Sequence, residues 1–482
     1  MKLKFITLLT ISAVTLAQQN VIAQNDETDN SDKIKLKSAE APASAERTEK
    51  VTWDGFDQTW WNGNDRRDSS VFHIPHFTPS ILIDNNFTHS FNDPNDHTVV
   101  GSTALSRNDE MVISAVNFGG DFEYNGARGR IMTQFGTRSQ LVPRNDLSPY
   151  RGQYDLADAY RYMDEAYLGY HFKNCLYGGI NVDFGLFMSY IGLNSYYQQE
   201  NWEYQASYTS DNTPWFFNGI RVQLWMSKYL KIEPWIINGW QSYGMFNQAP
   251  GFGCNVTWCP KESIKLLTND YYGTDAALLS GRHRFHSDNS FLLRYHQGSK
   301  THGINRAAFS VTADIGFEKG DGVNGFNNSD PVNNPAQYFE SWMVYNHIWF
   351  AKNKLGWYIG GGWMKNMGRY LVLAPTGDAS PLPNPYNPTA NGGTSGTHPF
   401  TENPGDYFEG WDCSTGIRWM PNQSVEFKIE WVHREASVPY FAGPGGVTSP
   451  TGYTTTPVPA TGWAPDLVTS ENRIIAAFLF RL

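Results

Sequence analysis

Charged and apolar residues alternate along several segments of the sequence. Between residues 425 and 431, the charged residues Glu426, Lys428 and Glu430 are separated by apolar side chains. Successive side chains of a β-strand point to opposite faces, so this segment predicts a strand with one charged and one apolar face. Carboxylates and cationic groups gathered on a shared wet face can select ions by their charge.

The same alternation selects a larger set of polar residues on the charged faces of other segments. The set comprises Arg128, Arg130, Glu165, Asp183, Arg221, Gln223, Asp314, Asp412, Arg418, Glu426, Lys428, Glu430 and Arg473. We expect these residues to line a pore. Each residue taken alone is also explained by pairing with an opposite charge on a neighbouring strand. As a group, inward charges of both signs indicate a water-filled interior.

Opposite charges in this set come from opposite ends of the chain. The early basic residues are Arg128, Arg130 and Arg221, and the late acidic residues are Asp412, Glu426 and Glu430. If the two groups face each other, they create a transverse field that favours small charged or dipolar solutes.

Motifs for catalysis or cofactor binding are absent from the sequence. It contains no Gly-x-Ser-x-Gly, no His-Glu-x-x-His and no phosphate-binding loop, and its 12 histidines form no ligand pair. Export would permit disulfides between the four cysteines, but we expect Cys175, Cys254, Cys259 and Cys413 to be ordinary small or buried residues. The sequence therefore predicts no enzyme, no cofactor and no metal site.

A two-residue hydrophobic period from residue 77 onwards predicts about sixteen strands. They lie near 79–91, 110–124, 127–137, 159–172, 178–189, 214–227, 230–240, 251–258, 263–272, 284–296, 305–318, 337–350, 355–370, 406–420, 424–435 and 470–482. Short connections, such as the hairpin turn Asn125-Gly126, alternate with long ones. Short turns on one side and long loops on the other are typical of transmembrane antiparallel up-and-down β-barrels, with short periplasmic turns and long extracellular loops.

Such a barrel must close on itself, because an open strand edge in hydrocarbon leaves backbone groups unpaired. We therefore expect residues 473–482 to pair with residues 80–91. The long connection at 190–213, polar and aromatic, is the segment that we expect to constrict the mouth.

The amino-acid composition argues against a helical membrane protein and against a nucleic-acid-binding protein. Hydrophobic residues make up 40% of the 482, and after the N-terminus no apolar run reaches the ~18 residues of a spanning helix. Aromatic residues reach 15%, as in barrels with aromatic girdles at both membrane interfaces. The net charge of -10, without a basic block, argues against a nucleic-acid partner.

Three regions follow along the chain. Residues 1–23 have the charged start and short apolar stretch of a signal peptide, and residues 76–482 form the predicted outer-membrane barrel. Residues 24–75 are expected to be a periplasmic N-terminal region, which is partly disordered because its first half is polar and mixed in charge. Its second half, from Trp53, is rich in tryptophan and either tucks into the barrel mouth or anchors at the membrane interface.

Several segments resemble the outer-membrane family known as beta-barrel porin-2. They are EAYLGY at 165–170, FGLFMSYIG at 184–192, ENWEYQASY at 200–208, TPWFFNGIRV at 213–222 and IINGW at 236–240. The resemblance implies a channel in the outer membrane of a Gram-negative bacterium. We expect passive diffusion of small hydrophilic solutes or ions, with outer-membrane lipid, the barrel assembly machinery and possible copies of the same chain as partners. The alternatives are a secreted all-β glycan-binding protein and an outer-membrane barrel enzyme.

Overall fold

The computed structural model divides the chain into two units, Met1–Thr48 and Glu49–Leu482. The residues that it describes all lie in the second unit, and they are 50, 52–67, 71–72, 74–143, 146, 152–298, 303–371, 373, 407–447, 451–452 and 465–482. The predicted signal peptide at 1–23 lies outside the described residues.

One antiparallel sheet of 17 strands makes up nearly all of this second unit. Sixteen of its strands form the wall: β1 (Phe77–Ser90), β2 (Met111–Tyr124), β3 (Ala127–Thr133), β4 (Met163–Phe172), β5 (Ile180–Met188), β6 (Phe216–Trp225), β7 (Leu230–Ile237), β8 (Gly251–Lys261), β9 (Ile264–Gly273), β10 (His283–Gln297), β11 (Ile304–Gly320), β13 (Tyr338–Phe350), β14 (Leu355–Met367), β15 (Tyr407–Trp419), β16 (Val425–Ala436) and β19 (Ser470–Arg481). The remaining strand, β12 (Val323–Asn324), adds two residues beside β11. The predicted strand number and order are confirmed.

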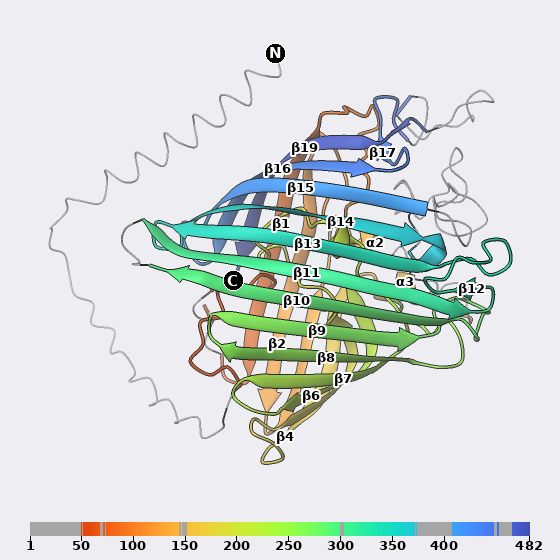
Figure 1. The fold of residues 1–482 in the computed structure, drawn as a ribbon. Coiled ribbons are helices and arrows are strands. Elements are labelled where there is room, and N and C mark those ends of the chain that lie inside the picture. Colours follow the sequence, from red (N-terminus) through yellow and green to blue (C-terminus); the bar gives the residue numbers. More distant parts are fainter. Residues whose placement is uncertain are drawn as a thin grey trace, which may run out of the picture. The chain divides into compact units, whose positions relative to one another are not determined.

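The sheet closes into a barrel because β1 pairs with both β2 and β19. The closing pair runs from Leu82 opposite Arg481 to Ser90 opposite Arg473, as the sequence predicts. Long connections, with β12 and the short strand β17 (Phe441–Ala442), lie at the right-hand end of the barrel in Figure 1. This end is the predicted extracellular side.

Two strand boundaries differ from the prediction by four residues, and the others by at most three. The third strand ends at Thr133 instead of continuing to 137, and Gly136 adopts a positive φ of 98° that a regular strand does not permit. The fourth strand begins at Met163, because the residues before it form the short helix α3 (Leu156–Tyr160). Asp155 caps this helix by accepting a hydrogen bond from the backbone N–H of Asp158 at 2.9 Å.

The remaining elements are short and belong to the long connections. They are α2 (Arg138–Leu141), α4 (Tyr208–Asp211), the 3-10 turn η3 (Gly368–Tyr370) and the strand pair of β17 with β18 (Leu467–Val468). No helix among the described residues is long and apolar enough to cross a membrane.

The strands of the wall have one apolar outer face and one polar inner face. Along β16, Phe427, Ile429 and Trp431 are exposed on the outside, whereas Glu426 and Glu430 are buried inside. A one-residue slip would turn these charges towards lipid, so the alternation fixes the register. Two of the segments that occupy the barrel interior, or lumen, are described below.

Candidate functional site

The first segment in the lumen is the connection between β5 and β6, residues 189–215, which we call the inner loop. Every residue from 201 to 210 is buried. Tyr190, at its start, donates a hydrogen bond to the carbonyl oxygen of Asp270 on β9 at 2.9 Å. A Cβ at Gly253 would lie 1.7 Å from the Tyr190 hydroxyl oxygen, so only glycine leaves room for this contact. The loop thus folds inward and does not merely border the mouth.

Charged residues of β16 hold the inner loop by its backbone. The Glu430 carboxylate accepts hydrogen bonds from the backbone N–H groups of Tyr204 at 2.6 Å and Gln205 at 2.9 Å. The Lys428 amine donates to three carbonyl oxygens of the loop, including that of Asn201 at 2.8 Å. Charge-assisted bonds of this kind are stronger than neutral ones, so both predicted pore-lining residues anchor the loop.

The neighbouring strands β15 and β19 contribute further anchors. Asp412 accepts hydrogen bonds from the Ser207 hydroxyl and the Tyr208 backbone N–H, both at 2.8 Å. Arg473 donates to the Gln205 side chain at 3.1 Å. The strands β15, β16 and β19, which we call the late-strand wall, therefore bind the inner loop along much of its length.

A second group of predicted residues comes together on β3 to β6, which we call the early-strand wall. The Arg221 guanidinium lies 2.8 Å from a carboxylate oxygen of Asp183, and Arg128 lies 3.5 Å from the same oxygen. Arg128 also donates to Gln223 at 2.9 Å. Three aromatic rings on neighbouring strands surround the Arg221 guanidinium within 5.6 Å, which fixes its position.

The other early pair is Arg130 with Glu165, whose charged atoms are 2.5 Å apart. Arg130 also lies 2.7 Å from Asp121 on β2. Each early arginine therefore has an acidic partner on its own side of the barrel, and the late acids bind the inner loop or nearby cations. This arrangement matches the alternative in which the charges pair locally.

Two predicted residues stand apart from these groups. Arg418 forms an ion pair with Glu426 at 3.0 Å near the short-turn end of the late-strand wall. Asp314 lies on β11 opposite Asp288 of β10, with His286 at 3.4 Å. Asp314 therefore joins neither the early-strand nor the late-strand group.

Solvent reaches the two walls to different extents. The side chains of Arg128, Arg130 and Arg221 are 24%, 15% and 13% exposed. In the late-strand wall, the side chains of Lys428 and Arg473 are at most 1% exposed. Among the predicted pore-lining residues, the cations that water reaches therefore lie on the early-strand wall.

The second segment in the lumen consists of residues 52–67, which we call the N-terminal segment. It begins at the turn between β6 and β7, where the backbone N–H of Trp53 donates to the carbonyl oxygen of Lys228 at 2.7 Å. Asp57 then lies 2.8 Å from Arg306 on β11. Trp60 and Trp61 are fully buried in a cluster with inward residues of β8 to β13. The segment therefore lies inside the barrel near its short-turn end.

The N-terminal segment and the inner loop contact each other directly. The backbone N–H of Trp202 donates to the Asn62 side chain at 2.8 Å. Gly63 has a φ of 72°, and a Cβ there would lie 2.1 Å from the carbonyl oxygen of Leu193. Burial raises the pKa of the Glu203 carboxyl, and hydrogen bonds from Asn194 and Asn62 offset part of that rise. Sequence reasoning left this contact undecided, although three tryptophans in a polar stretch were a signal for it.

No group of three or more His, Cys, Asp or Glu side chains within the described ranges could hold a metal ion. The four cysteines are free thiols. Cys254 and Cys259 lie on β8 and Cys413 lies on β15, so these three residues are part of the wall.

The family model described as "Putative beta-barrel porin-2, OmpL-like" matches residues 77–458. The chain belongs to this family. The match spans every strand of the wall except the closing strand β19, and it agrees with the closed barrel and its polar lumen. The protein is therefore an outer-membrane porin of a Gram-negative bacterium, and the secreted glycan-binding alternative is not favoured.

Solved structures with a similar fold include outer-membrane proteins of low sequence identity. In-vitro folded OmpT of Vibrio cholerae is 9% identical with a TM-score of 0.45, covering 84% of this chain and 99% of its own. The anion-selective porin from Comamonas acidovorans is 8% identical with a TM-score of 0.45, at the same coverage. OprD of Pseudomonas aeruginosa is 10% identical with a TM-score of 0.33, covering 87% and 98%. No curated protein matches the sequence.

Proposed function

We propose that the porin conducts small hydrophilic solutes or ions by passive diffusion along the early-strand wall, without a catalytic step. The observation that carries this proposal is the difference in exposure between the two walls. Arg128, Arg130 and Arg221 keep water-accessible surface, whereas the late-strand wall is covered by the inner loop. Charged side chains along a wet path set ion preference, so these three arginines and their acidic partners are the pore-lining residues.

The N-terminal segment restricts this path at the short-turn end. Its support is the burial of Trp60 and Trp61 and the ion pairs of Asp57 with Arg294 and Arg306. In this proposal residues 1–23 are a signal peptide, 24–75 form the periplasmic N-terminal region that enters the barrel at 52–67, and 76–482 form the barrel.

The outer surface is the proposed contact with lipid and with further copies of the chain. Apolar residues such as Leu168, Phe184 and Ile417 are more than half exposed there. Exposed apolar bands on barrels face hydrocarbon. In this proposal the same faces meet the assembly machinery before insertion.

Single-channel recording of the refolded full chain in planar bilayers tests the proposal. We expect small, regular current steps, and severalfold larger steps after deletion of residues 24–67. Deletion of residues 24–48 alone is the control, and it is expected to leave the step size unchanged. Absence of steps from both the full and the shortened chain contradicts the channel proposal. Equal steps from all three chains contradict the obstruction by the N-terminal segment.

A further inference from the structure

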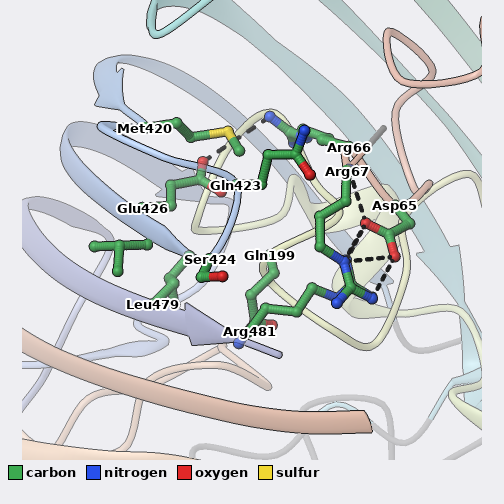
Figure 2. A pocket seen from close by; sticks show the side chains of 11 residues that line it. Asp65, Arg66, Arg67, Gln199, Met420, Gln423, Ser424, Glu426, Leu479 and Arg481 are labelled. Carbon is green, nitrogen blue, oxygen red and sulfur yellow. Dashed lines mark hydrogen bonds and ion pairs between the residues drawn. The ribbon is translucent and has the colours of Figure 1, made fainter. Parts of the chain in front are cut away.

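A pocket lies where the N-terminal segment meets the late-strand wall, at the short-turn end of the barrel. The empty space within it, including the part that is open to solvent, is about 250 Å³. Figure 2 shows the N-terminal segment on one side and the strands β16 and β19 on the other. The charged and amide side chains that line it include Asp65, Arg66, Arg67, Gln199, Glu426 and Arg481.

Positive charge is in excess around this pocket. Arg66, Arg67 and Arg481 line it together with the carboxylates of Asp65 and Glu426. Behind the lining, Glu426 also has Arg418 at 3.0 Å and Lys428 at 3.7 Å, and Arg481 pairs with Glu200. The lining itself therefore holds three guanidinium groups and two carboxylates, which favours an anion there.

The arginines also have donors that the protein does not use. Arg66 donates through Nη2 to the carbonyl oxygen of Glu200 at 3.0 Å. Its Nε and Nη1, together with Nε of Arg481 and Nη1 of Arg418, are buried and have no hydrogen-bond acceptor among the described residues. A buried donor without an acceptor is costly, and an oxygen-rich anion supplies acceptors with the geometry that guanidinium groups match.

A second arginine of the lining, Arg67, is held by its neighbour Asp65. Arg67 binds Asp65 through Nε and Nη2, and Arg481 lies 3.0 Å from the same carboxylate. Burial raises the pKa of Asp65, but Arg481 and Arg67 outweigh this and hold it below its ordinary value. Asp65 therefore fixes one side of the pocket. On the other side, Nη1 of Arg66 lies 3.9 Å from the Glu426 carboxylate, and both Nη1 and Nε of Arg66 remain without a hydrogen-bond acceptor among the described residues.

We propose that this pocket binds a small oxyanion, such as inorganic phosphate or a carboxylate, between Arg66 and Arg481. The site lies on the late-strand side, away from the proposed path along the early-strand wall, and does not rest on the proposed function. It gives the periplasmic end of the barrel an anion site that ties the N-terminal segment to β16 and β19.

Isothermal titration calorimetry on the refolded full chain in detergent tests whether this site binds an anion. Phosphate or acetate is added at constant ionic strength, with chloride as the balancing anion. We expect saturable binding of phosphate, weakened about tenfold in Arg66→Gln and tightened about tenfold in Glu426→Gln, because the two changes remove opposite charges. Arg107→Gln, an exposed arginine paired with Glu110 in the loop between β1 and β2, is the matched control and should bind as the native chain does.

Acetate distinguishes a general carboxylate site from one that requires a tetrahedral anion. If neither anion binds the native chain saturably, the pocket holds water and the proposal is wrong. Binding that neither Arg66→Gln nor Glu426→Gln alters also overturns it. Should Arg66→Gln fail to refold, the sign of the change in Glu426→Gln still decides. Conductance is measured separately, so failure of the channel proposal leaves this result intact.

Discussion

The indole N–H of Trp202 donates a hydrogen bond to the backbone carbonyl oxygen of Trp60 at 3.2 Å. The two residues come from the inner loop and the N-terminal segment, 142 positions apart in the sequence. Trp202 also stacks on His347 and meets Trp349 edge-on, both on β13. The two segments and the wall are therefore joined at one point. A change that moves one segment should also displace the other.

Replacing Gly63 by alanine should loosen the N-terminal segment. The added Cβ would lie 2.1 Å from the carbonyl oxygen of Leu193, so either the inner loop or the segment must move. We expect faster cleavage of residues 52–67 by protease added to the short-turn side, and larger current steps. Gly55→Ala is the matched control, because Gly55 also has a positive φ but no atom within 4 Å of the new Cβ.

Both glycine variants carry the backbone strain of a positive φ, about 1–2 kcal/mol. The difference between them therefore reports the clash with Leu193. Equal protease sensitivity in the two variants would show that the close approach of Gly63 to the inner loop does not hold the segment.

Glu430→Gln should release part of the inner loop from the late-strand wall. The carboxylate accepts from two backbone N–H groups and from the Tyr358 hydroxyl, and an amide has only one oxygen to offer. Loss of one charged hydrogen bond costs about 1.5–3 kcal/mol. We expect a lower midpoint of urea unfolding and noisier open-channel current. Glu435→Gln, at an exposed position of the same strand, is the control and should change neither measurement.

Arg221→Glu should shift the reversal potential in a salt gradient towards cation preference. The change removes the positive partner of Asp183 and adds a second negative charge beside it on the wet wall. Arg107→Glu makes the same change of charge on an exposed loop and should leave the reversal potential as it is. Unchanged conductance and reversal potential in Arg221→Glu would mean that Arg221 does not line the constriction. Heat-modifiable migration in gels confirms that each variant has folded.

Acid should weaken the attachment of the N-terminal segment through Asp65. The ion pair with Arg481 and Arg67 lowers the pKa of this carboxyl from 3.8, so its stabilising effect is present above pH 3.8 and is lost as the pH falls below that value. Protease sensitivity of residues 52–67 in the native chain should rise in that range. Asp65→Asn cannot titrate there and should lack this step, so an identical pH profile in both chains would exclude Asp65 as its cause.

The barrel could be predicted from the sequence because each wall strand carries its own signal. Along residues 425–431, the alternation of charge and apolar side chains fixes both the strand and its faces. The closing pair of β1 with β19 followed from the need to leave no edge in hydrocarbon. The short helix α3 was not predicted, because Asp155 and the first three residues of the helix lie in the predicted connection between strands, and the predicted strand begins at 159.

The inward direction of the candidate residues was also predictable, but their partners were not. Alternation places Glu430 and Asp183 inside the barrel without saying what they meet there. Asp183 pairs with the neighbouring strand, whereas Glu430 binds a loop more than 200 positions away. Such long-range contacts depend on how the inner loop folds, and no periodic pattern marks that loop.

The inner loop also sets an order of assembly. Tyr204 is 226 positions from Glu430, and Tyr208 is 204 positions from Asp412, so the loop is made long before the strands that hold it. Its backbone groups can find these partners only after β15 and β16 have joined the sheet. An immature barrel should therefore be more open than the mature one, and the lumen becomes narrow only late in assembly.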